Sequence, residues 1–141
     1  MISPKSLFYR VVRKDGKWWG VLNRGSTFRV GIQGSYSLRK PGFSCDLKNG
    51  FLTVNRHSRW DFATGAIDTE DMRIASLLHD AFCNMYNEDI IPFGVRRKAD
   101  VLFRKVLKEQ GCPFIRRWYA YLAVSAYTYT REIGWHIVKR K

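Results

Sequence analysis

Short runs of β-forming residues alternate with turn residues through the first 60 positions, which is typical of a sheet made of short strands. Asn49-Gly50 gives the stronger hairpin signal, because both residues tolerate the positive φ of a two-residue turn, and Asp15-Gly16 gives a second one. The expected strands cover residues 7–13, 18–22, 27–32, 36–38, 43–47 and 51–54. We therefore expect a small antiparallel sheet in this half of the chain.

From residue 68 onward the period changes, and apolar residues recur every three or four positions, as they do on one face of a helix. The expected helices cover residues 69–87, 95–110 and 114–129, with a basic tail over 131–141. Asp68 has the side chain of an N-cap for the first helix. The third helix is apolar or aromatic on most sides, so we expect it to be largely buried or paired with another surface. The pattern predicts one α+β domain over residues 1–141, in which a small antiparallel sheet is followed by three packed helices.

Positive charge dominates the chain, with 25 Lys and Arg against 12 Asp and Glu and a formal net charge of +13. The excess lies in residues 1–60 and 94–141, whereas residues 61–93 are acidic. Two interpretations stay open: the acidic segment packs between the basic flanks, or the flanks bind an anionic partner while the acidic segment binds a cation or carries out chemistry. Nucleic acid, a virion component or an acidic lipid fits the second interpretation, and a host protein is a further candidate partner. The candidate anion-binding residues are Arg96, Arg97, Lys98, Arg116 and Arg117.

The cysteines and the apolar segments limit where the protein works. Cys45, Cys83 and Cys112 form no Cys-x-x-Cys pair, which argues against a structural zinc site and for a reducing compartment. The N-terminus lacks the apolar core of a signal peptide, and the most apolar window, residues 118–129, is shorter than the ~20 residues that span a bilayer. We therefore expect a protein that is neither secreted by that route nor integral to a membrane, with the cytoplasm as the default location.

The first expected helix carries a polar stripe between two apolar sides. Residues three and four apart share one face of a helix, and polar residues on a buried helix are costly without partners. His79 stands beside the stripe, one turn from two of its members. The stripe consists of Arg73, Ser76, Asp80, Cys83 and Asn84.

Asp100 lies at the edge of the apolar face of the second expected helix. If the two helices pack as an antiparallel pair, Asp100 can face His79 or Asp80. A carboxylate beside the histidine would fix the imidazole tautomer and raise its basicity, as in a general base, and Asp80 would then be available to hold a divalent cation. Asp61, in the loop before the helix, could reach the same place. The candidate catalytic residues are His79, Asp80 and Asp100, the supporting residues Arg73, Ser76, Asp61 and Arg96, and the metal ligands Asp80 and Asp61.

Purely structural roles are the alternative for the same residues. A single histidine on a buried helix is more often a hydrogen-bonded core residue than a catalyst. Asp80 with Arg73, and Asp100 with Arg96, can form buried ion pairs that only hold the helices in register. Cys83 lacks a basic neighbour that would lower its pKa, so it is expected to be a small core residue and not a nucleophile.

Three segments carry a combined motif. Asp61-Phe62-Ala63-Thr64-Gly65 is followed by Arg73-Ile74-Ala75-Ser76-Leu77-Leu78-His79-Asp80-Ala81-Phe82, and then by Arg96 with Ala99-Asp100-Val101-Leu102-Phe103. Together, over residues 43–130, they resemble a family of small phage and prophage proteins that is catalogued as a domain of unknown function. Phe62 stands where that family usually has Gly, and Phe82-Cys83 where it tends to have Tyr.

A looser similarity is to the helix pair of phospholipase A2, in which a His-Asp step on one helix meets an Asp on the next. This resemblance implies that His79 is the base, Asp80 a calcium ligand and Asp100 the residue that orients His79. The glycine-rich calcium loop and the flanking disulfides of that enzyme are missing from this chain, so the similarity is one of motif and not of ancestry.

Two hypotheses about function follow. The first is a phage-encoded protein of the host cytoplasm or the virion with a hydrolase-like His-Asp site, in a version with or without a divalent cation. The second is a non-enzymatic phage accessory or structural protein that binds a host protein, a virion component or nucleic acid through its basic flanks. Nucleic-acid binding alone is less favoured, because the sequence contains no recognisable nucleic-acid-binding module.

Overall fold

The computed structural model describes residues 8–61 and 70–139. Within these residues the chain forms seven strands and then three helices, which confirms the α+β prediction. The strands are β1 (Tyr9–Lys14), β2 (Lys17–Leu22), β3 (Ser26–Arg29), β4 (Ser35–Lys40), β5 (Phe43–Lys48), β6 (Phe51–Val54) and β7 (Arg59–Asp61). The helices are α1 (Glu70–Asn87), α2 (Phe93–Glu109) and α3 (Phe114–Lys139).

Both predicted hairpins are present, because their turns are decided by two adjacent residues. Strands β1 and β2 pair around Asp15 and Gly16, whose φ values are 55° and 77°. Strands β5 and β6 pair around Asn49 and Gly50, at 51° and 86°. Positive φ at both central positions gives the tight turn whose twist matches that of the flanking strands.

The strands form two sheets, so the expectation of a single sheet was wrong. One sheet has the order β1-β2-β7 and the other the order β3-β6-β5-β4, and every pairing is antiparallel. Strand β7 was expected to be part of the loop that leads into the first helix. It pairs with β2 from Trp19↔Asp61 to Val21↔Arg59, and three residues are too few to show the alternation that identifies a strand.

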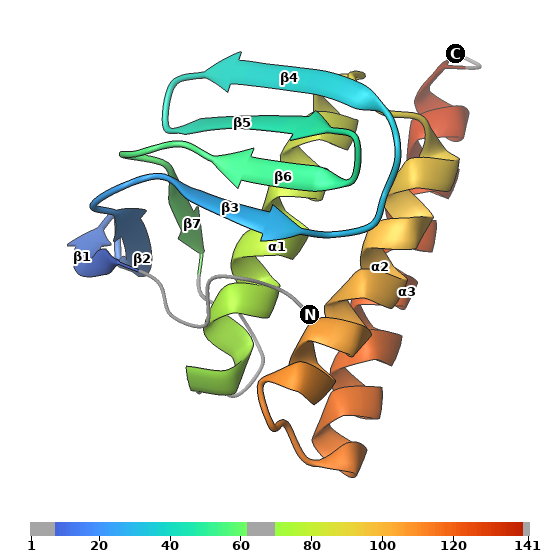
Figure 1. The fold of residues 1–141 in the computed structure, drawn as a ribbon. Coiled ribbons are helices and arrows are strands. Elements are labelled where there is room, and N and C mark those ends of the chain that lie inside the picture. The colour runs from blue at the N-terminus through green and yellow to red at the C-terminus, as the bar shows by residue number, and fades with distance from the viewer. Residues whose placement is uncertain (1–7, 62–69, 140–141) are drawn as a thin grey trace.

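Helix α1 packs between the sheets and the other helices. It contacts α2 on one side and β4, β5 and β7 on the other, while α3 lies along α2 (Figure 1). The chain runs in one direction along α1, returns along α2 and turns back again along α3 (Figure 1). The first two helices are therefore antiparallel, which is the condition under which Asp100 can face His79 or Asp80.

The core is continuous from the sheets into the helices. Alternate residues of β5 point inward, and α1 and α2 each present an apolar face to it. Trp60 of β7 is fully buried, and its indole Nε1 donates a hydrogen bond to the Ser76 hydroxyl of α1 at 3.2 Å. This contact fixes the three-stranded sheet against the helix that carries the candidate site.

Helix α3 extends well beyond its expected end, whereas α1 and α2, where the structure describes them, agree with their expected ranges to within two residues. Helix α1 begins at Glu70, and the expected cap Asp68 lies outside the described residues. Helix α3 continues to Lys139, so the basic tail expected from residue 131 is helical as far as the structure describes it. Residues 130–139 contain no proline, and the single Gly134 costs a helix only about 1 kcal/mol.

Candidate functional site

The central contact of the site joins His79 of α1 to Asp100 of α2. The His79 Nε2 atom lies 3.0 Å from Asp100 Oδ1. Asp100 is completely buried, and Arg96 Nη1 donates to its Oδ1 at 2.7 Å while Arg97 Nη1 donates to its Oδ2 at 2.6 Å. The two oxygens of this carboxylate therefore accept hydrogen bonds from one imidazole and two guanidinium groups.

Burial and these neighbours decide the protonation states of the pair. Burial alone would raise the pKa of Asp100, but the hydrogen bond with His79 and the charge of Arg96 outweigh it, so the pKa is lowered. For His79, burial is the largest effect and lowers the pKa; the hydrogen bond to Asp100 raises it, but not enough to compensate. The pair is thus a carboxylate and a neutral imidazole at neutral pH.

The tautomer of His79 follows from this assignment. An ionised carboxylate only accepts hydrogen bonds, so Nε2 carries the proton and donates it to Asp100. The Nδ1 atom is then left as an acceptor. Cys83 Sγ lies 3.6 Å from that Nδ1 atom, because residues four apart on α1 are one turn from each other.

Cys83 completes a chain of three side chains, Cys83–His79–Asp100. Its sulfur contacts the acceptor nitrogen of His79 and also accepts a hydrogen bond from Arg96 Nη2 at 3.1 Å. Burial raises the pKa of the Cys83 thiol to about 12, although the charge of Arg96 acts in the opposite direction. The sulfur therefore carries its proton, and a nitrogen able to accept that proton lies 3.6 Å from the sulfur.

Cys83 was expected to lack a basic neighbour that would lower its pKa. Arg96 lies beside the sulfur and acts in that direction, but burial outweighs it and the pKa of the thiol is raised. Two basic groups, the His79 imidazole and the Arg96 guanidinium, lie beside its sulfur. The spacing of four residues between His79 and Cys83 is visible in the sequence and was a usable signal. The contact with Arg96 was not, because it joins two helices.

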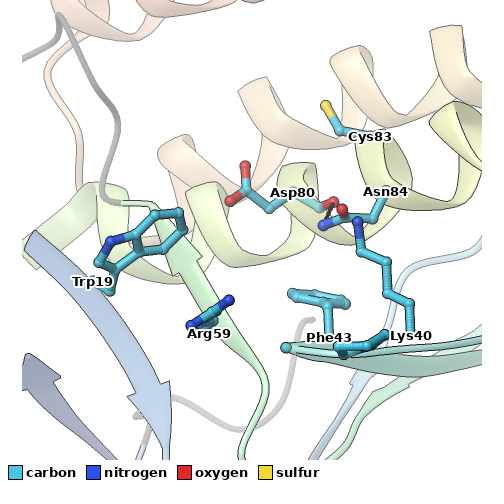
Figure 2. A pocket seen from close by; sticks show the side chains of 9 residues that line it. Trp19, Lys40, Phe43, Arg59, Asp80, Cys83 and Asn84 are labelled. Carbon is cyan, nitrogen blue, oxygen red and sulfur yellow. Dashed lines mark hydrogen bonds between the residues drawn. The ribbon is translucent and has the colours of Figure 1, made fainter. Parts of the chain in front are cut away.

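A pocket of about 300 Å³ lies against the side of α1 that faces the strands (Figure 2). Asp80, Cys83 and Asn84 of α1 form one wall, while the cations Lys40 and Arg59 project from the strands. The Cys83 sulfur points away from the strand residues, toward the Arg96 side of α1. Cys83 thus lines the pocket, while its sulfur is directed toward Arg96 of α2. The remaining lining residues are Trp19, Pro41, Gly42 and Phe43.

Asp80 belongs to this pocket and not to the buried His79–Asp100 pair. Consecutive helical residues point about 100° apart, and Figure 2 shows the Asp80 carboxylate directed toward Trp19. Its backbone carbonyl accepts a hydrogen bond from Asn84 Nδ2 at 2.9 Å. Of the three predicted catalytic residues, the structure thus brings two together and leaves the third about a quarter-turn away.

The supporting residues of α1 hold the helix to the strands. Arg73 Nη1 donates to the Tyr9 hydroxyl of β1 at 2.9 Å. Ser76 accepts the indole hydrogen bond of Trp60 and donates to the Arg73 carbonyl at 3.0 Å. Both residues thus position α1 on the three-stranded sheet.

Of the two predicted metal ligands, Asp80 and Asp61, the structure describes only the side chain of Asp80. Among the residues described, no three His, Cys, Asp or Glu side chains gather as a group that could hold a metal ion. Asp80 lies on the pocket wall. The side chain of Asp61 is outside the described part of the chain, so its predicted role stays a prediction.

The predicted anion-binding residues do not form one exposed cluster. Arg96 is only 3% exposed and is used by Asp100 and Cys83, which corrects its assignment to the surface. Arg97 is partly buried. Its Nη1 donates to the Asp100 carboxylate and also to the Ser125 hydroxyl, the second at 3.3 Å. Lys98 is exposed. Arg116 Nε donates to Cys112 Sγ at 3.5 Å, and the Arg117 guanidinium lies 5.4 Å from the ring centroid of Phe114.

A protein-family model described as a protein of unknown function, DUF1353, matches residues 40–124. The chain belongs to this family. The matched DUF1353 segment begins in β4 and ends in α3, so it contains His79, Cys83 and Asp100, as well as the pocket wall that α1 forms. No curated protein and no solved structure matches the chain. In the described residues, no helix is both long and apolar enough to cross a membrane.

Proposed function

We propose that the protein is a hydrolase in which Cys83 is the nucleophile, His79 the general base and Asp100 the residue that positions the base. The observation that supports it is the continuous chain of contacts, 3.6 Å from the thiol to Nδ1 and 3.0 Å from Nε2 to the carboxylate. A nucleophile within reach of a base that a third group orients is the common arrangement of covalent catalysis.

The reaction that we propose is the hydrolysis of an ester or amide, in which the acyl group is transferred to water by way of Cys83. The Cys83 sulfur attacks the carbonyl carbon of an ester or amide while His79 Nδ1 takes the thiol proton. The leaving group departs with that proton, and the acyl group remains on sulfur as a thioester. His79 then removes a proton from water, the resulting hydroxide displaces the thiolate, and the acid is released as the proton returns to sulfur.

The neighbours of the three residues suit these steps. His79 starts neutral, which is the form that accepts a proton. Asp100 stabilises the imidazolium that forms, and its carboxylate is already held by two guanidinium groups, so it need not move. Arg96 Nη2, 3.1 Å from the sulfur, offsets the negative charge that develops there as the proton leaves.

The test uses the full chain and p-nitrophenyl acetate as an acyl donor that needs little specific recognition. Release of p-nitrophenolate is followed by absorbance, and the acetylated peptide is identified by mass spectrometry after an acid quench. Wild type is expected to carry one acetyl group on Cys83, and Cys83→Ala to lose both the adduct and the turnover. Far-UV circular dichroism of each variant shows whether it is folded.

Cys112→Ala is the matched control. Cys112 is buried, and its sulfur, like that of Cys83, accepts a hydrogen bond from an arginine, here Arg116. This variant should keep the adduct on Cys83 and the turnover. Equal acetylation of Cys112, or full turnover in folded Cys83→Ala, would refute the assignment of the nucleophile.

Three finer points belong to the same proposal. A divalent cation at Asp80 would polarise the substrate carbonyl, and a metal titration of the acetylation rate tests that version.

Phage origin and a place in the host cytoplasm or the virion are supported by the resemblance of the motifs to phage and prophage proteins. Mass spectrometry of purified particles against cell lysate would separate the two locations.

Non-enzymatic binding is the second candidate function, and one observation favours it. Helix α3 exposes several large apolar side chains near basic ones, although apolar residues of a helix are usually packed inward. The partner that this face suits is argued below.

A further inference from the structure

The first two to three turns of α3 present an exposed apolar surface, which we name the α3 apolar face. The exposed fractions of its side chains are 64% for Phe114, 82% for Ile115, 37% for Trp118, 69% for Tyr119 and 61% for Leu122. At about 100° per residue, these five positions fall within about 140° of the helix circumference. They form one stripe, whereas scattered exposed apolar residues would need no explanation.

The opposite side of α3 already has its partner. Helix α3 packs along α2, with Ala120 buried and Val124 packed against the core. Four side chains of the α3 apolar face are more than 60% exposed, and the fifth, Trp118, meets Arg104 of α2. This helix was expected to be largely buried or paired with another surface. Because α2 covers only one of its sides, the first alternative was wrong for these turns, and the second stays a prediction.

The charges around the α3 apolar face are positive. The Arg104 guanidinium lies 4.5 Å from the Trp118 ring centroid and 4.7 Å from that of Tyr121. Arg116 and Arg117 lie in the same turns of the helix. The sequence contains no Asp or Glu between Gln110 and Thr130, and the acidic residue just before this segment is Glu109 at the end of α2.

Exposed apolar side chains next to positive charges favour one kind of binding partner over two others. A phosphate backbone would be attracted by the arginines but would leave Ile115 and Leu122 in water. A second copy would bury the apolar stripe, but it would bring two positively charged surfaces together in a protein of net charge +13. A bilayer with anionic headgroups accommodates both the apolar side chains and the arginines. The aliphatic side chains enter the acyl region, while Trp, Tyr and Arg stay at headgroup level.

We propose that the α3 apolar face docks the protein onto the surface of a membrane that contains anionic phospholipids. The helix lies in the plane of the interface and does not span the bilayer. The proposal is independent of the hydrolase assignment, because none of the five side chains contacts the Cys83–His79–Asp100 chain in the contacts that the structure describes.

The experiment is flotation of the full-length protein with vesicles on a density gradient. One set of vesicles is pure phosphatidylcholine, and the other contains equal amounts of phosphatidylcholine and phosphatidylglycerol. The native protein is expected to float with the second set and not with the first, and added salt should weaken the binding because it screens the arginines. The Cys83→Ala variant should float as the native protein does.

Point variants locate the contact. Ile115→Asp and Leu122→Asp should each weaken vesicle binding by about tenfold or more, because each removes the burial of one large aliphatic side chain. Val11→Asp is the matched control: Val11 is also exposed, at 47%, and the charge change is the same, but it lies on β1. This control should bind within about twofold of the native protein, as it leaves the contact area intact.

Each other outcome overturns the proposal. These outcomes are no flotation, equal flotation with both sets of vesicles, or an equal effect of Ile115→Asp and Val11→Asp. A native dimer that Ile115→Asp converts to monomer, seen by analytical ultracentrifugation, would assign the face to a second copy. Retention on duplex DNA that Ile115→Asp abolishes, without vesicle binding, would assign it to nucleic acid.

Discussion

Replacement of Asp100 by Asn is expected to damage both the stability and the chemistry of this protein. The carboxylate is completely buried and accepts hydrogen bonds from His79, Arg96 and Arg97. An amide supplies one acceptor oxygen and one NH₂ donor, so at least one of these donors would face another donor. Removal of one partner from a buried charged cluster leaves the remaining charges uncompensated, at a cost of about 3–5 kcal/mol.

Asp46→Asn is the control with which the loss of stability in Asp100→Asn is compared. Asp46 is held by Arg39 at 2.9 Å and by the Ser37 hydroxyl at 2.7 Å, so its contacts are as short as those of Asp100. The Arg39 side chain is 58% exposed and that of Asp46 34%. Solvent screening reduces such a pair to at most about 1 kcal/mol. Burial, and not contact distance, is therefore what separates the two variants.

Urea denaturation followed by tryptophan fluorescence measures both free energies of unfolding. A loss in Asp100→Asn no larger than the loss in Asp46→Asn would refute the description of the buried cluster. Under conditions in which Asp100→Asn remains folded, its acetylation rate should be about 10³ to 10⁴ times lower than that of wild type, because His79 loses the partner that fixes its tautomer.

The pKa of His79 is lowered from its ordinary 6.5, so below that pH the unfolded chain binds a proton that the folded chain does not. The free energy of unfolding is therefore unaffected by this group above about pH 6.5 and falls below it, by up to about 1.4 kcal/mol per pH unit. In His79→Gln, the urea midpoint of unfolding should depend less on pH in that range. Gly42→Ala should cost about 1–3 kcal/mol, because φ is +87° and a Cβ would lie 2.9 Å from the Nε of the β7 arginine. At Gly94, where a Cβ meets nothing within 4 Å, alanine should leave the thermal midpoint equal or higher, and a drop like that of Gly42→Ala would count against this argument. Trp60→Phe removes the buried hydrogen bond to α1 and should cost about 1–3 kcal/mol, and an unchanged unfolding midpoint would mean that this contact does not fix the sheet to the helix.

Local signals in the sequence predicted much of this fold. The Asp15-Gly16 and Asn49-Gly50 turns were predictable because each depends on two adjacent residues. The helices were predictable from their apolar spacing, and the same spacing put Asp100 on the face that meets α1. The contact between His79 and Asp100 followed from those two facts together.

Long-range contacts account for what the sequence did not reveal. Strand β7 is defined by its pairing with β2 some 40 positions earlier, between Trp19 and Asp61 for example. The Arg96 contact to the Cys83 sulfur joins two helices, so a spacing within one helix could not indicate it. The exposure of α3 depended on how many sides α2 covers, which composition alone does not decide.

The protonation state of the His79 ring tests the central claim most directly. Two-dimensional ¹H–¹⁵N NMR, optimised for two-bond couplings, distinguishes the neutral tautomers and the imidazolium of a ¹⁵N-labelled histidine. At neutral pH the ring should be uncharged, with the proton on Nε2 toward Asp100 and an unprotonated Nδ1 toward Cys83. An imidazolium, or a neutral ring protonated on Nδ1, would contradict the chain in which His79 receives the thiol proton.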